Sequence, residues 1–219
     1  MARSGGRMKP RILLADDHKI VLEGLRTLLE PECEIVGTVE DGRALLAEVE
    51  KLHPDLIVAD ISMPLLNGIE AVRQIKKTDP KIKVVFLTMH PDVTYAARAF
   101  ETGASGYVLK HSASSELVTA IRDALRGRTY VTPMIAGELM ESLREGVHRQ
   151  RDLVKKITAR QREVLQLLAE GHSAKEAAAI LHVSTRTVEF HKYRMMQQLN
   201  LKTSAELVQY AIKHGIVSI

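Results

Sequence analysis

The sequence predicts an α/β fold for roughly its first 130 residues and a small all-α domain after them. Between about residues 9 and 128, short apolar runs alternate with amphipathic stretches, as expected for repeated βα units. From Thr158 onward the spacing of apolar residues is helical throughout. We therefore expect a five-stranded, doubly wound parallel sheet followed by a helix-turn-helix domain.

Each predicted strand is a short apolar run that ends in polar or turn-forming residues. The stretch Leu56–Asp60 has four apolar residues in a row before a carboxylate. A run of this kind indicates a strand covered on both faces, as in parallel sheets. Amphipathic helices are expected between successive strands. The predicted strands are Ile12–Ala15, Glu34–Val39, Leu56–Asp60, Lys83–Thr88 and Gly106–Lys110.

The two predicted domains are joined by a polar, charged segment. Thr132-Pro133 interrupts the pattern, so we interpret residues 129–154 as a linker that contains one helix, Met134 to Arg144. The predicted domains are thus 9–128 and 155–219, and residues 1–8 are expected to be a leader.

Four helices are predicted in the second domain. The second and third are separated by His182-Val183 alone, which is the spacing of a helix-turn-helix. Ser184 is expected to cap the N-terminus of the third. The helices are expected from Thr158 to Gly171, Ala174–Leu181, Ser184 to about Leu199, and around Leu207–Ile212.

Composition and charge limit the possible classes of protein. One cysteine, Cys33, rules out an internal disulfide framework, and no apolar stretch approaches the roughly 18 residues of a membrane span. We therefore expect a cytoplasmic protein with no membrane partner. Residues 1–130 carry equal numbers of acidic and basic side chains, whereas residues 149–219 carry 12 basic and six acidic ones. This asymmetry favours a polyanionic partner for the second domain, although a solvated basic face would give the same count.

Reactive side chains gather at the predicted strand ends. Asp16 and Asp17 follow the first strand, Asp60 ends the third, Thr88 the fourth and Lys110 the fifth. In a parallel sheet these ends share one edge. Three carboxylates placed together require a cation, and a set of hard oxygen ligands suits Mg²⁺. With Lys110 and Thr88, such a site can neutralise a phosphoryl group during transfer to the Asp60 carboxylate.

These residues resemble the receiver domain of two-component response regulators, which has a flavodoxin-like fold. The resemblance covers about residues 9–128 and rests on Asp16-Asp17, Asp60 to Gly68, Thr88 and Gly106 to Lys110. It implies that a histidine kinase phosphorylates Asp60. It further implies that Asp17, Asp60 and the backbone carbonyl of Ser62 bind Mg²⁺ while Asp16 acts on the metal through water, and that Thr88, Lys110 and Tyr107 respond to the phosphoryl group.

The second domain resembles the LuxR/NarL type of DNA-binding domain over about residues 155–216. The resemblance rests on the segments Thr158 to Leu165, Gly171 to Glu176 and Val183 to Val188. It implies that the helix Ser184–Leu199 lies in the major groove of double-stranded DNA. The residues expected to contact DNA are Ser184, Thr185, Thr187, Glu189, Phe190, Lys192, Tyr193 and Arg194.

Two features of this domain remain open. Glu189 and Phe190 stand where lysine and a small β-branched residue are frequent in the family, so the base sequence that the helix reads cannot be inherited from better-known members. Because one helix-turn-helix reads few base pairs, a homodimer on paired half-sites is expected. The last helix offers Leu207, Val208, Ala211 and Ile212 as interface candidates, although packing within its own domain explains them equally well.

The sequence thus predicts a transcription factor that is controlled by phosphorylation. We expect it to catalyse only its own phosphorylation and no reaction on an outside substrate. Two alternatives remain. One is a Mg²⁺-dependent phosphohydrolase that uses the same carboxylates on an outside substrate, and the other is a DNA-binding protein whose receiver is vestigial and whose binding does not depend on phosphorylation. In the unphosphorylated state, we expect the receiver or the linker to restrain either the recognition helix or its dimerisation.

Overall fold

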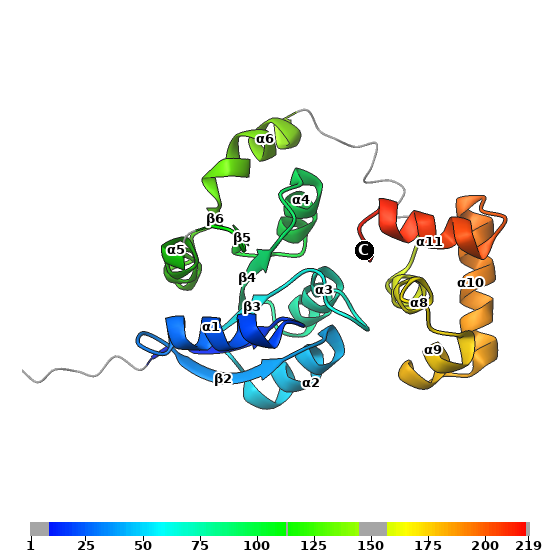
Figure 1. Ribbon diagram of the computed structural model, residues 1–219, viewed down its shortest axis with the longest axis horizontal. Coiled ribbons are helices and arrows are strands. Elements are labelled where there is room, and N and C mark those ends of the chain that lie inside the picture. The colour runs from blue at the N-terminus through cyan, green and yellow to red at the C-terminus, as the bar shows by residue number, and fades with distance from the viewer. Residues whose placement is uncertain (1–8, 113, 145–156, 218–219) are drawn as a thin grey trace, which may run out of the picture.

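A computed structural model describes residues 9–112, 114–144 and 157–217 of the chain. These residues form an α/β domain and a smaller helical domain, which lie side by side (Figure 1). The predicted leader 1–8 and residues 145–156 of the predicted linker lie outside the described residues.

The α/β domain is built on a parallel sheet with the strand order β2-β1-β3-β4-β5-β6. The order reverses between β1 and β3, so the crevice at their carboxyl ends is the expected place for a ligand. Ala15 pairs with Ala59, so β1 and β3 end level, and Ala59 pairs with Phe86, so β4 extends two residues further. The strands are β1 Arg11–Ala15, β2 Glu34–Val39, β3 Leu56–Ala59, β4 Lys83–Thr88, β5 Gly106–Leu109 and β6 Tyr130–Val131.

The five predicted strands and the parallel, doubly wound fold are confirmed, but the sheet has a sixth strand. Tyr130 and Val131 pair with Gly106 and Tyr107 of β5. A two-residue strand is too short to show a hydrophobic period, and the following Thr132-Pro133 looked like a break in the chain. The proline instead starts helix α6 at a position where no amide hydrogen bond is required.

Helix α6 belongs to the α/β domain and not to a linker. Its residues Ile135 and Leu139 are 2% and 4% exposed and join the core beside α4. The α/β domain therefore extends through residue 144, past the predicted boundary at 128.

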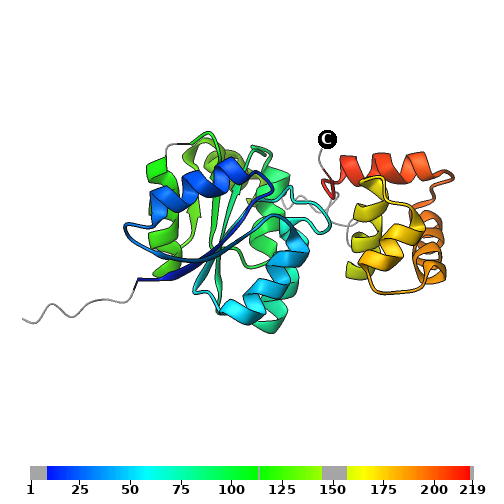
Figure 2. The same ribbon diagram turned by 60° about the horizontal axis from the view of Figure 1, so that its bottom comes forward.

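Helices cover both faces of the sheet (Figure 2). One core lies under α1 and α5, and the other lies under α2, α3 and α4, with α6 beside α4. The fully apolar β3 is buried along its whole length, as predicted for a strand covered on both faces. The helices are α1 Lys19–Leu29, α2 Gly42–Leu52, α3 Gly68–Thr78, α4 Val93–Glu101, α5 Ser114–Leu125 and α6 Pro133–Arg144.

The helical domain contains the four predicted helices around one apolar core. Ser184 caps α10 as predicted, since its hydroxyl accepts a hydrogen bond from the Thr187 amide at 3.1 Å. His182, between α9 and α10, has a left-handed backbone with φ of 53°. The helices are α8 Ala159–Ala169, α9 Ala174–Ile180, α10 Thr185–Leu199 and α11 Ser204–Lys213.

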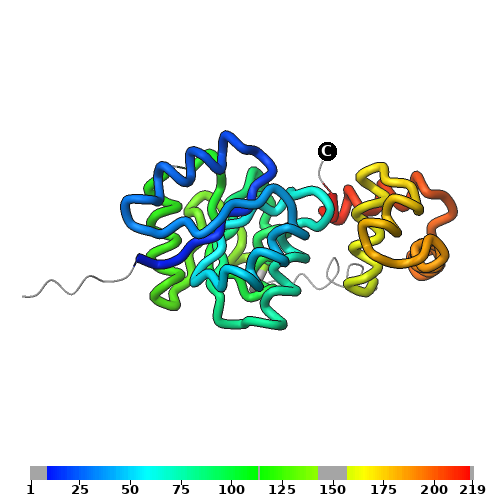
Figure 3. Tube along the Cα trace, turned by 90° about the horizontal axis from the view of Figure 1, so that it is seen from below, coloured from blue at the N-terminus to red at the C-terminus, as the bar shows by residue number. Residues whose placement is uncertain are grey.

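The two domains contact one another through α8 and the segment that follows α11. Helix α8 lies between α10 and the α/β domain (Figures 1 and 3). Within residues 9–112, 114–144 and 157–217, none of the helices combines the length and apolar character needed to cross a membrane.

Candidate functional site

The acidic residues predicted at the sheet edge come together around a lysine. Asp16 follows β1 and Asp60 follows β3, and their side chains are only 2% and 5% exposed. The ammonium group of Lys110, which follows β5, lies 2.7 Å from Asp16 Oδ2 and 2.8 Å from Asp60 Oδ2. Burial alone lowers the pKa of Lys110, but hydrogen bonds to both carboxylates and attraction to their charges together outweigh burial and raise that pKa above its ordinary value.

This acidic edge has the donor set of a site for a hard cation. Carboxylate oxygens of Asp16, Asp17 and Asp60 and one ring nitrogen of His18 all lie within 4.8 Å of one another. His18 Nδ1 is 2.8 Å from Asp17 Oδ1. Asp17 is exposed, so one side of the cluster is open to water. Carboxylates with an open side suit a partly hydrated divalent cation, and the residues therefore fit a metal ion.

The loop after β3 is folded tightly against Asp60. The Ile61 amide donates to Asp60 Oδ1 at 2.6 Å, and the Gly68 amide donates to the Ile61 carbonyl oxygen at 2.9 Å. A Cβ atom at position 68 would overlap the carbonyl oxygen of Asp60. This close approach explains why the segment from Asp60 to Gly68 ends in a glycine.

Thr88 and Tyr107 both form hydrogen bonds with the backbone of His90. Both are fully buried. Thr88 Oγ1 accepts a hydrogen bond from the His90 amide at 3.3 Å, and the Tyr107 hydroxyl donates to the His90 carbonyl oxygen at 2.7 Å. Burial raises the pKa of the Tyr107 hydroxyl. The two predicted switch residues are thus connected through one residue of the β4–α4 loop.

Sequence reasoning did not identify His90 itself. Its ring Nε2 hydrogen-bonds Ser62 Oγ at 2.7 Å, and the ring stacks on Tyr95 with 4.3 Å between centroids. Burial lowers the pKa of His90, and this effect outweighs the opposing charges of Asp60 and Asp92. A single histidine two residues after Thr88 carries no signal of this role in the sequence.

Sequence reasoning also missed a hydrogen-bonded contact between the loop that follows Asp60 and helix α8. Gln166 Oε1 accepts from the Asn67 amide at 2.7 Å, and Gln166 Nε2 donates to the Met63 carbonyl oxygen at 3.0 Å. Glu170, which caps α8, accepts from the Leu65 amide at 3.2 Å. The loop that begins at Asp60 is therefore bonded to the helical domain through its main chain.

Ion pairs extend this interdomain contact on both sides. Arg162 Nε lies 2.8 Å from Glu70 Oε1, where both side chains are at most 10% exposed. Glu163 accepts from Arg43 at 3.1 Å. Arg98 of α4 donates to the carbonyl oxygen of His214, just after α11, at 2.7 Å. These charges hold α8 and the end of α11 against the α/β domain.

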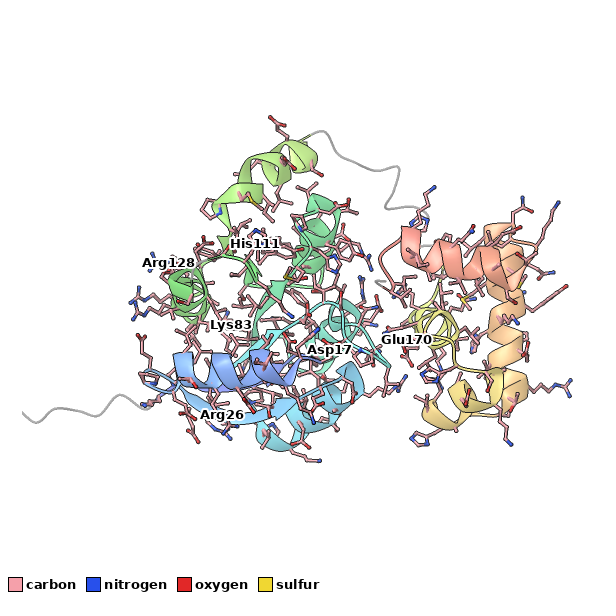
Figure 4. The ribbon with its side chains drawn as sticks, in the orientation of Figure 1. Asp17, Arg26, Lys83, His111, Arg128 and Glu170 are labelled. Carbon is pink, nitrogen blue, oxygen red and sulfur yellow. The ribbon has the colours of Figure 1, made fainter. Side chains whose placement is uncertain are left out.

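A cavity of about 380 Å³ opens along the same contact. Asp17 lines it from the acidic edge and Glu170 lines it from α8 (Figure 4). Burial raises the pKa of Glu170, although its hydrogen bonds to Gln166 and Leu65 act in the opposite direction. Residues of the acidic edge and of the helical domain thus line one cavity.

Helix α10, which carries the predicted DNA-contacting residues, lies on the far side of α8 from the α/β domain (Figure 1). Val188 and Met195 are fully buried on its inner side. These two residues pack in the core of their own domain. A restraint by the receiver or the linker, on the recognition helix or on its dimerisation, stays a prediction. Exposed on α10 or at its N-cap are Ser184, Thr185, Glu189, Phe190, Tyr193 and Arg194, whereas Thr187 and Lys192 are partly exposed.

The interface candidates on α11 divide into two pairs. Leu207 and Ala211 are 1% and 0% exposed and pack in the core of their own domain, so they are excluded from a surface interface. Val208 and Ile212 are partly exposed. In the sequence, each of the two buried residues is directly followed by one of the two partly exposed ones, so the apolar pattern alone did not separate them.

Comparison with known proteins gives matches to both domains. The family model for the response regulator receiver domain matches residues 12–122, and the model for bacterial regulatory proteins of the luxR family matches residues 155–211. The transcriptional regulatory protein DegU of Brevibacillus brevis is 34% identical over 96% of both chains.

Solved structures of RcsB are similar over nearly the whole chain. One shows RcsB from Salmonella enterica serovar Typhimurium bound to promoter rprA with the phosphomimetic BeF3⁻. It is 28% identical, has a TM-score of 0.56, and the match covers 92% of this chain and 98% of that one. Another, with the same identity and TM-score, shows two RcsB dimers bound to two parallel DNAs, and the match covers 92% of this chain and 97% of that one.

Proposed function

This chain belongs to the two-component response regulators that carry a LuxR-type DNA-binding domain, and from this premise we propose that phosphorylation of Asp60 controls its binding to DNA. The phosphoryl donor is a histidine kinase, and the protein acts in the cytoplasm. The observation that carries the proposal is the convergence of Asp16, Asp60 and Lys110 at one edge of the sheet.

The chemical step is a phosphoryl transfer between two side chains. A carboxylate oxygen of Asp60 attacks phosphorus, a P–O bond forms, the P–N bond to the kinase histidine breaks, and the released imidazole takes up a proton. The hydrogen bond from the Ile61 amide holds the Asp60 carboxylate in a fixed orientation. Asp16, Asp17, Asp60 and the backbone carbonyl of Ser62 would hold Mg²⁺, which when bound neutralises charge on the phosphoryl oxygens.

Lys110 and Thr88 then respond to the new charge. The phosphoryl group adds negative charge and acceptor oxygens beside an ammonium group that is already within 2.8 Å of Asp60. A movement of the Thr88 hydroxyl toward it would disturb the hydrogen bond with the His90 amide. Because His90 also accepts from Tyr107, the change would reach the buried tyrosine.

A second route leads from Asp60 to the helical domain. The loop that follows Asp60 is bonded to Gln166 and Glu170, so a change in this loop alters the energy of the interdomain contact. A phosphoryl group shifts the balance of docked and released domains only by the difference in its interaction energy with the two states. We propose that release frees the helical domain to dimerise on paired half-sites, with Val208 and Ile212 in the interface.

The phosphorylation is tested by incubating the full chain with Mg²⁺ and a radiolabelled small phosphodonor. We expect an acid-stable, base-labile phosphate on the wild type and none on Asp60→Asn. Asp79→Asn is the control, since this carboxylate lies at the other end of α3 from Asn67. Label that persists on Asp60→Asn would contradict the assignment of the site.

The same preparation separates the two alternative functions. A phosphohydrolase would release phosphate over many turnovers, whereas a receiver is modified once and then slowly loses its label. Binding to DNA is measured with and without phosphodonor on a site selected from a random pool. Equal affinity for DNA with and without phosphodonor would support a DNA-binding protein that does not depend on phosphorylation.

A further inference from the structure

The exposed face of α10 carries two large aromatic rings. Phe190 and Tyr193, three residues apart and so on one side of the helix, are 58% and 61% exposed. Val188 and Met195, which are fully buried, mark the opposite side. The rings therefore project from the face that the proposed function turns toward DNA.

Phe190 differs from the other two phenylalanines of the chain. Phe86 is fully buried in the core under α3, and Phe100 is partly buried against that core. The ring of Phe190 instead contacts neighbours on its own helix. The guanidinium carbon of Arg194 lies 5.8 Å from the ring centroid, and the His191 ring meets it edge-on at 5.9 Å. These contacts orient the ring but leave most of it in water.

A phenyl ring has no hydrogen-bonding group, so it can recognise only an apolar feature of a base pair. In the major groove the apolar group that a base pair presents is the C5-methyl group of thymine. We propose that Phe190 is a specificity-determining residue that reads thymine methyl groups in the operator. The proposal rests on the proposed function, because it requires α10 to enter the major groove.

The neighbours of Phe190 support a base contact rather than a phosphate contact. Glu189 is exposed beside it, and a carboxylate is repelled by phosphate but accepts a hydrogen bond from the amino group of cytosine. Arg194 provides the positive charge on the same face, one turn further along. The apolar ring and the carboxylate are both better suited to base edges than to phosphates, so we expect this part of α10 to contact bases.

The test uses the full-length protein treated with phosphodonor. A bound site is selected from random double-stranded DNA, and each thymine in it is replaced singly by deoxyuridine, which lacks the methyl group. Dissociation constants are measured by fluorescence anisotropy at one fixed salt concentration, since salt alone changes the affinity. For the wild type we expect binding to weaken about fourfold at one or two thymines, the factor for loss of one buried methyl group.

Variants then assign the effect to the ring. In Phe190→Ala the ratio between the thymine and deoxyuridine sites should fall to about one, and in Phe190→Leu it should stay above one. Glu189→Gln is the matched control on the same face, and it should keep the fourfold ratio while its overall affinity changes. Because Phe190 is exposed, its variants are expected to fold, which circular dichroism checks.

The outcomes distinguish this inference from the function on which it rests. If no thymine in the selected site is sensitive to loss of its methyl group, or if the sensitivity is unchanged in Phe190→Ala, the role of Phe190 is overturned while DNA binding stands. If no DNA is enriched from the pool, the proposed function fails and the role of Phe190 fails with it.

Discussion

The side-chain oxygen of Gln166 accepts a hydrogen bond from the main-chain amide of Asn67 at 2.7 Å, and both residues are buried. Asn67 caps α3 with its own side chain, and it lies on the loop that starts at Asp60. One glutamine of the helical domain is therefore bonded to the segment that connects Asp60 with α3.

We expect Gln166→Ala to loosen the contact between the domains. The substitution leaves the Asn67 amide and the Met63 carbonyl without this partner, and an unpaired buried polar group is destabilising by about 1–3 kcal/mol. The fraction of released domains should rise several-fold, which small-angle X-ray scattering would detect as a larger radius of gyration. Gln209→Ala, on the exposed surface of α11, is the control. An unchanged radius for Gln166→Ala would show that the remaining interdomain hydrogen bonds and ion pairs suffice to hold the domains together.

Two glycine substitutions should have opposite effects on stability. Gly68→Ala places a Cβ atom against the Asp60 carbonyl, so the loop must move, and we expect about 1–3 kcal/mol of destabilisation. Gly24 lies within α1, and a Cβ there has no atom within 4 Å. Gly24→Ala should stabilise the protein by about 0.5–1 kcal/mol, since alanine favours a helix. Urea unfolding measures both, and equal effects would contradict the close approach at Gly68.

The carboxylate cluster was predictable because strand ends are readable in the sequence. Asp16, Asp60 and Lys110 each directly follow an apolar run, and parallel strands bring such ends to one edge. The helix-turn-helix of the second domain was predictable for a similar local reason, since Ser184 accepts from the Thr187 amide three residues further on and His182 adopts a left-handed backbone in the turn.

The remaining features depend on contacts between distant parts of the chain. Tyr130-Val131 forms a strand only because β5 offers an unpaired edge. The bond between Asn67 and Gln166 joins residues 99 positions apart, and no periodicity encodes it. The inner and outer residues of α11 could be separated only once the helix was packed against α8.

Lys110→Met should make the stability of the protein more dependent on Mg²⁺. Without the ammonium group, Asp16 and Asp60 remain as buried neighbouring carboxylates, and removal of one partner from a buried ion pair is destabilising by about 3–5 kcal/mol. A divalent cation can replace that charge. In calorimetry we expect a lower melting temperature than for the wild type in chelator, and a larger rise on addition of Mg²⁺. Lys81→Met, an exposed lysine before β4, is the control. An equal rise in both variants would contradict the role of Lys110 as counter-charge.

Tyr107→Phe should change how stability depends on pH. Burial raises the pKa of Tyr107 in the folded protein above the value of about 10 in an unfolded chain. Above pH 10 the folded protein keeps a proton that the unfolded chain loses, so this tyrosine makes stability fall as pH rises. At pH 7.5 the variant should be about 1 kcal/mol less stable, because the hydrogen bond to the His90 carbonyl is lost. The difference in the free energy of unfolding between the wild type and the variant should shrink between pH 10 and 11, by up to about 1.4 kcal/mol per pH unit, and can change sign.

The measurement for Tyr107 is urea unfolding at pH 7.5, 10 and 11, with Val108→Ala as the control. Val108 is 1% exposed on the same strand and does not titrate, so its loss should destabilise the protein equally at each pH. The wild type and Val108→Ala should therefore fall in parallel as pH rises, while Tyr107→Phe falls less steeply. If Tyr107→Phe instead runs parallel to the other two, the hydroxyl ionises as readily in the folded protein as in the unfolded chain, and the buried hydrogen bond to His90 is not maintained in solution.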